Sequence, residues 1–119
     1  MRHRNSKAIL NRPADHREAM VRNLLTSLFL HGKVKTTDAR AKALASAAEK
    51  LITKVRGKDD MNAIREAMRV LTTKEASQKL IKYASEAKVT SGYTRNTRVG
   101  YRAGDNALLV MVELIHDNE

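Results

Sequence analysis

Apolar residues recur at every third or fourth position through much of the chain, which is the period of an amphipathic helix. The first such segment opens at Pro13, which suits a first helical turn, and stops at Gly32. The second follows Thr37, a residue able to cap a helix, and stops at Gly57. The expected core-facing residues are Met20, Val21, Leu24, Leu25 and Leu28 in the first helix, and Ala41, Leu44, Ala48, Leu51, Ile52 and Val55 in the second.

Two shorter helices are predicted next. One follows Asp60, and the other begins at Thr72, where Thr72-x-x-Glu75 matches a capping box. The apolar period of each helix selects one face for the core. The expected inward residues are Ile64, Ala67, Met68 and Leu71 in the third helix, and Ala76, Leu80, Tyr83 and Ala84 in the fourth.

From Val89 the period changes to the two-residue alternation of a β-strand. The segment from Ala107 to Ile115 is apolar at nearly every position, as a buried strand would be. Glycines between the two segments supply a turn or bulge, so the segments should pair as an antiparallel hairpin. The expected faces of the first strand are Tyr93, Arg95, Thr97 and Val99 on one side, and Thr94, Asn96 and Arg98 on the other.

These elements predict an α+β fold with about four helices and a small sheet closed by a C-terminal antiparallel hairpin. Residues 33–36 are either a third strand or a short connector. Residues 1–12 show neither period and form an expected extended basic arm, and residues 13–119 form a single globular domain.

Charge is distributed unevenly along the chain, whose net charge is +10. Residues 1–58 hold 14 Lys/Arg and 4 Asp/Glu, whereas residues 59–119 hold 9 of each, so the surplus lies wholly in the first half. The arm carries Arg2, Arg4, Lys7 and Arg12 with no acid. Ordering it alone would cost about 1–2 kcal/mol per residue with little apolar burial in return. We expect an arm that contacts phosphates; an inert tail is the alternative.

The sequence gives no support for a catalytic or a metal-binding site. The chain lacks cysteine, and none of its four histidines has the i, i+4 spacing of a metal pair. No carboxylate pair lies in an apolar frame, and no glycine loop is followed by the Lys-Ser/Thr of a phosphate loop. We therefore predict no catalytic residue, metal, cofactor or small-molecule substrate. The longest apolar stretch, from Leu108 to Val112, is too short to cross a membrane, so a soluble intracellular protein is expected.

The hairpin combines tyrosines with arginines, namely Tyr93, Arg95, Arg98, Tyr101 and Arg102. Arginine binds phosphate through two nitrogens, and a tyrosine ring or guanidinium can stack on an unpaired base. The alternative is two core tyrosines beside surface arginines. For the cations on the first two helices there are two interpretations, namely contact with phosphates or a solvated helix face.

Several stretches together resemble the bacterial large-subunit ribosomal protein L-seventeen (L17) family. They extend over essentially the whole chain in family order. They include Met1-Arg2-His3-Arg4, His16-Arg17-x-Ala19-Met20-x-Arg22, Lys35-Thr36-Thr37, Gly92-Tyr93-Thr94-Arg95 and Arg102-Ala103-Gly104-Asp105-Asn106-Ala107.

The resemblance implies a non-enzymatic scaffold that binds large-subunit ribosomal RNA near the peptide exit tunnel. Its partners would be that RNA and neighbouring ribosomal proteins, and its location the cytoplasm, on the ribosome. Together with the charge pattern, it gives an expected RNA-binding set of Arg2, His3, Arg4, Asn5, Lys7, Arg12, His16, Arg17, Arg22, Lys35, Tyr93, Thr94, Arg95, Arg98 and Arg102. Charge alone also allows a free nucleic-acid-binding regulator or nucleoid-type DNA-binding protein, although the turn signals do not produce a helix-turn-helix frame.

Overall fold

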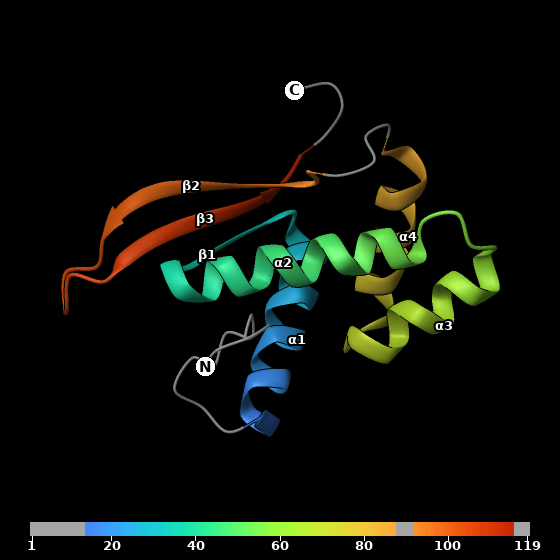
Figure 1. The fold of residues 1–119 in the computed structure, drawn as a ribbon, viewed down its shortest axis with the longest axis horizontal. Helices are drawn as coiled ribbons and strands as arrows, with labels where there is room; N and C mark the ends of the chain where they lie inside the picture. Colours follow the sequence, from blue (N-terminus) through green and yellow to red (C-terminus); the bar gives the residue numbers. More distant parts are fainter. Residues whose placement is uncertain (1–13, 88–91, 116–119) are drawn as a thin grey trace, which may run out of the picture.

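The computed structural model describes residues 14–87 and 92–115, so the predicted arm lies outside the described residues. The described chain forms four helices and one three-stranded sheet (Figure 1), which confirms the predicted α+β class. In chain order these are α1 (Ala14–His31), β1 (Lys33–Thr37), α2 (Asp38–Val55), α3 (Asp60–Val70), α4 (Lys74–Glu86), β2 (Thr94–Tyr101) and β3 (Leu108–Leu114). No described helix is long and apolar enough to cross a membrane.

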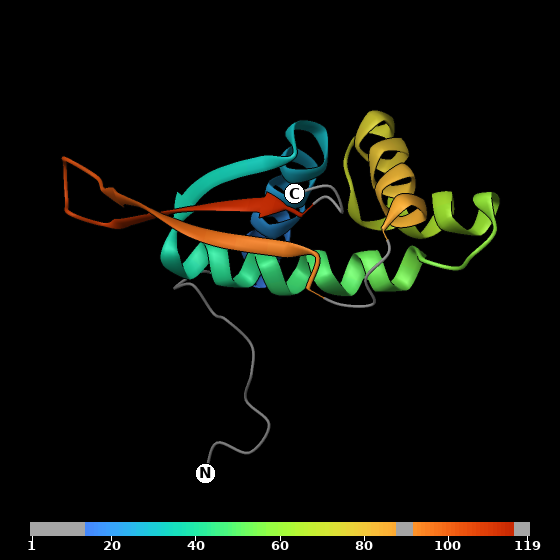
Figure 2. The same cartoon turned by 90° about the horizontal axis from the view of Figure 1, so that it is seen from above.

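The sheet has the order β1-β3-β2, and both pairings are antiparallel. β3 takes the centre because it is apolar at nearly every position and can be flanked on both sides. β1 pairs with it from Lys33 opposite Glu113 onward, so residues 33–37 are a strand and not a connector. β2 and β3 form the predicted hairpin, which projects beyond the helices (Figures 1 and 2).

Helices cover one face of this sheet. α2 lies along it and contacts all three strands, α1 packs against β1 and β3, and α3 and α4 pack beside the far end of α2 (Figure 1). Alternate β3 residues, Val110, Val112 and Leu114, are buried on this face. Every predicted core residue of α2 is buried, and so are the predicted inward residues of α4.

The core face of α3 differs in part from the prediction. Ala67 and Leu71 are buried as expected and Ala63 is buried as well, whereas Ile64 and Met68 are exposed by 41% and 52%. Alanine lets α3 approach α2 and α4 closely, and the larger side chains then fall on the outer side. In α1, similarly, the core is formed by Leu25 together with Leu28 and Phe29, and Met20 is only half-buried.

The cap of α4 lies one residue later than predicted. Thr73 is the N-cap, and its Oγ1 accepts a hydrogen bond of 3.2 Å from the N–H of Ala76. Thr72 instead donates through its N–H and its hydroxyl to Oγ1 of Thr26, at 3.1 and 3.2 Å. These bonds satisfy a buried hydroxyl in α1, which explains why Thr72 is not available as a cap.

Candidate nucleic-acid interface

The sheet face turned away from α2 carries the exposed cations of β1 and β2. Register places Lys33, Glu113 and Arg95 in one row across the three strands. The next row holds Lys35, Met111 and Thr97. We call these six residues the open face; its lysines and Arg95 are exposed, while Glu113 and Met111 are partly buried in its centre. A flat surface edged with cations suits a phosphate backbone.

Arg95 is held by an ion pair on this face. Its Nη2 lies 2.8 Å from Oε2 of Glu113, and the two side chains are 51% and 30% exposed. A solvent-exposed pair of this kind contributes about 0–1 kcal/mol to stability. Glu113 therefore orients Arg95 and lowers the positive charge of the face more than it stabilises the fold.

Arg95 and Arg98 lie on opposite faces of β2, because they are three residues apart on a regular stretch of the strand and the β-bulge begins only after Arg98. The pairing shifts between Arg98, opposite Val110, and Gly100, opposite Leu109. Arg98 therefore lies on the face of Val110, opposite to that of Arg95. The two-residue alternation of the sequence predicts the same division of Arg95 and Arg98 between two faces, and the register confirms it.

Arg102 and Asp105 form a clip in the hairpin turn. Nε and Nη2 of Arg102 lie 3.0 and 2.6 Å from the two carboxylate oxygens of Asp105. The hydrogen bond from Arg102, followed by one from the N–H of Ala107, lowers the pKa of the Asp105 carboxyl to about 2. The pair is therefore ionised above that pH and is lost only as the pH falls through it. Nε and Nη2 of Arg102 are therefore both hydrogen-bonded within the turn.

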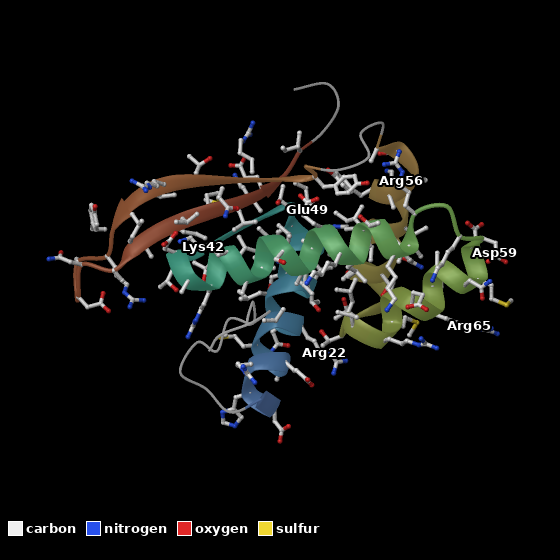
Figure 3. The ribbon with its side chains drawn as sticks, viewed as in Figure 1. Arg22, Lys42, Glu49, Arg56, Asp59 and Arg65 are labelled. Atoms are coloured by element: carbon white, nitrogen blue, oxygen red, sulfur yellow. The ribbon has the colours of Figure 1, made fainter. Side chains whose placement is uncertain are left out.

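Tyr93 and Thr94 are engaged inside the domain. The Tyr93 ring is 1% exposed and meets the ring of Tyr83 edge-on at a centroid distance of 6.4 Å. Its hydroxyl accepts a 2.8 Å hydrogen bond from Nη1 of Arg56. Thr94 donates from its N–H and its hydroxyl to Oε1 of Glu49, at 3.0 and 3.2 Å. Both residues fasten β2 to the helices (Figure 3 labels Glu49 and Arg56 on α2 and at its end), so the Tyr93 ring cannot stack on a base in this structure.

The α1 candidates lie apart from the sheet, because the N-terminal end of α1 points away from it (Figure 1). His16 is exposed and, with Met20, Leu24 and Arg40 among others, lines an open hollow of about 420 Å³. Arg22 is exposed, and its Nε donates a 2.8 Å hydrogen bond to the carbonyl of Val70 at the end of α3 (Figure 3). Arg17, half-buried, lies one residue after His16.

Sequence reasoning missed Lys33, Glu49 and Arg56. The alternation Lys33-Val34-Lys35 already signals that both lysines share one strand face, once residues 33–37 are known to be a strand. No sequence signal pairs Arg56 with Tyr93, because the contact joins residues 37 positions apart. Among residues 14–87 and 92–115, no group of three His, Cys, Asp or Glu side chains could hold a metal ion.

Comparison with known proteins decides the family. A family model described as ribosomal protein L17 matches residues 20–115, a range that includes all three strands and most of α1. The chain belongs to the ribosomal protein L17 family. This confirms the resemblance drawn from the sequence. The family is structural and non-enzymatic, which confirms the prediction that the chain is not an enzyme.

Three relatives illustrate the extent of the match, and each is named large ribosomal subunit protein bL17. The protein from Desulforapulum autotrophicum is 44% identical over 119 residues, covering 98% of either chain. The protein from Sulfurimonas denitrificans is 43% identical, over 97% of this chain and 100% of its own. The one from Geotalea daltonii is also 43% identical but longer, so the chain spans 65% of its length.

Proposed function

We propose that this chain is a structural constituent of the large ribosomal subunit, where it binds and stabilises large-subunit ribosomal RNA near the peptide exit tunnel. Membership of the L17 family supports the ribosomal role and does not favour a free DNA-binding regulator. The observation that carries RNA binding is the open face, where Lys33, Lys35 and Arg95 flank the central strand. The protein acts in the cytoplasm as part of the ribosome, with ribosomal RNA and neighbouring ribosomal proteins as partners.

The proposed RNA contacts come from the arm with α1 and from the sheet. Each cation that neutralises a phosphate releases condensed counterions, so affinity depends on salt. The Tyr93 ring, the Thr94 hydroxyl and the Arg102 guanidinium are left out because they are engaged within the chain. The proposed set is Arg2, His3, Arg4, Asn5, Lys7 and Arg12 in the arm, His16, Arg17 and Arg22 in α1, and Lys33, Lys35, Arg95 and Arg98 in the sheet.

Substitutions of the Arg95–Glu113 pair should shift RNA affinity in opposite directions. Arg95→Ala removes one phosphate-binding cation, so we expect affinity for purified large-subunit ribosomal RNA to fall several-fold and the salt slope to drop by roughly 0.7–0.9. Glu113→Gln removes the repelling carboxylate and should tighten binding. Either change should alter the free energy of unfolding by less than about 1 kcal/mol.

Filter binding at several salt concentrations, with urea unfolding of each variant, measures both quantities. The two variants are matched controls, because each breaks the same ion pair. If both weakened binding equally, the ion pair itself would matter and direct phosphate contact by Arg95 would be ruled out.

We further propose that the outer side of α3 meets a neighbouring ribosomal protein. Met61, Ile64 and Met68 are exposed by 62%, 41% and 52% and share one side of the helix at i, i+3 and i+7. Glu66 lies within 3.5 Å of Lys54 and Lys58 and within 3.3 Å of Arg69, so these three cations near the helix are already paired. An uncharged aliphatic surface of a protein fits this stripe better than a phosphate backbone does.

Photo-cross-linking in assembled large subunits tests this assignment. A photoreactive amino acid in place of Met68 should cross-link to protein, because the side chain it replaces is exposed and apolar. The same amino acid in place of Lys35, on the open face, should cross-link to ribosomal RNA. Cross-links from position 68 to RNA would contradict the protein contact.

A further inference from the structure

Tyr101 is an exposed aromatic side chain that the fold does not use. It is 71% exposed, whereas Tyr83 and Tyr93 are 8% and 1% exposed and have hydrogen-bonded hydroxyls. Leaving a ring in water forgoes the free energy that its burial would provide. An exposed ring on a projecting hairpin is therefore available for a partner (Figure 1).

The bulge brings this ring to the same side of β2 as Arg98. Residues three apart on a regular strand point to opposite faces. Here Arg98 is opposite Val110 and Tyr101 is opposite Leu108, and these β3 residues are two apart and share a face. Gly100, between them, has φ of +156°, a conformation that side-chain-bearing residues rarely adopt. Gly100 thus permits the bulge that places a guanidinium and an aromatic ring side by side along one edge strand.

Backbone and side-chain hydrogen bonds stabilise the turn next to Tyr101. The Arg102 N–H donates to the carbonyl of Ala107, and the Asn106 N–H donates to the carbonyl of Arg102, both at 2.8 Å. The Arg102–Asp105 clip closes the same turn from its side chains. A fixed platform loses less conformational entropy on binding than a mobile loop does. Among the described residues, no side chain pairs with Arg98, so its charge is available beside the platform.

We propose that Tyr101 is a stacking platform for an unpaired RNA base, with Arg98 binding the adjacent phosphate. This inference rests on the proposed RNA-binding function and specifies the ligand of the hairpin. A base inside a helical stem is already stacked on its neighbours, so the ligand is an unpaired or bulged nucleotide. The guanidinium of Arg98 on the same face as the ring favours RNA over a protein surface.

Tyr101→Ala should weaken binding to purified large-subunit ribosomal RNA by about 5- to 100-fold, the usual range for one stacked base. The salt slope should stay unchanged, because no charge is removed. Tyr101→Phe keeps the ring and should bind within about twofold of the parent chain. Val99→Ala is the matched control: Val99 is 51% exposed in the same hairpin but is aliphatic, so its loss should leave affinity unchanged.

Fluorescence gives a second readout. The chain contains no tryptophan, so Tyr101→Trp supplies a single indole that a stacked base should quench. Parental affinity in Tyr101→Ala with no quenching in Tyr101→Trp would overturn stacking and leave RNA binding intact. Reduced retention of Tyr101→Ala in assembled subunits, without any loss of RNA affinity, would assign the ring to a protein contact and also overturn it. Failure of the unsubstituted chain to bind the RNA would instead reject the proposed function.

Discussion

Replacing Tyr93 by alanine is expected to lower the free energy of unfolding by about 3–5 kcal/mol, the usual cost of removing a buried aromatic side chain. The ring is 1% exposed, packs edge-on against Tyr83 and holds its hydroxyl against Arg56. Domains of this kind have total stabilities of about 5–15 kcal/mol, so the variant should be marginally folded. Urea unfolding followed by circular dichroism measures the loss.

Two variants separate the contributions. Tyr93→Phe keeps the packing and removes only the hydroxyl. We expect it to lower the free energy of unfolding by a smaller amount, about 1–3 kcal/mol, because Nη1 of Arg56 loses this acceptor. Tyr101→Ala removes an exposed ring and should change stability by less than about 0.5 kcal/mol. If Tyr93→Ala kept the stability of the parent chain but bound RNA more weakly, Tyr93 would be an RNA contact, as the sequence suggested, and not a core residue.

Removing residues 1–12 is expected to weaken RNA binding by on the order of 10²–10³-fold at 0.1 M salt. The segment carries Arg2, Arg4, Lys7 and Arg12, so its loss removes four cations and no acid. With roughly 0.7–0.9 counterions released per phosphate contact, the slope of log affinity against log salt should fall by about 3. Thermal unfolding should be nearly unchanged, because the segment has little apolar surface to bury.

The matched control for this truncation retains the chain length. A variant with the four cations replaced by glutamine should lose as much affinity and as much salt dependence as the truncated protein, if charge is what matters. A salt slope equal to that of the parent chain in either variant would show that the arm does not contact phosphates.

Helix positions followed closely from the sequence, since periodicity and end signals act locally. The buried face of α2 agrees residue by residue, and α1 ends at His31, directly before Gly32, whose φ is +80°. The face of α3 could not be predicted in this way. Periodicity favours large apolar residues such as Met68 for the core, but close packing between helices buries Ala63 beside the expected Ala67 and leaves Met68 exposed.

The binding surface was harder to predict because it depends on contacts between distant segments. Alternation alone placed Tyr93 with Arg95, and nothing in the sequence shows that Arg56 and Tyr83 enclose that ring. A bulge also shifts every later residue to the other face, so Arg98 and Tyr101 could not be grouped by counting. The basic composition indicated a nucleic-acid partner, and the family resemblance specified ribosomal RNA. The register of β1 on β3 identified which cations share a face.

The most direct test of a ribosomal scaffold is cosedimentation of the tagged full-length chain through a high-salt wash, followed by ultraviolet cross-linking. The chain should remain with large subunits and form cross-links to large-subunit ribosomal RNA. A chain that runs free of ribosomal particles and forms no such cross-links would contradict the proposed function.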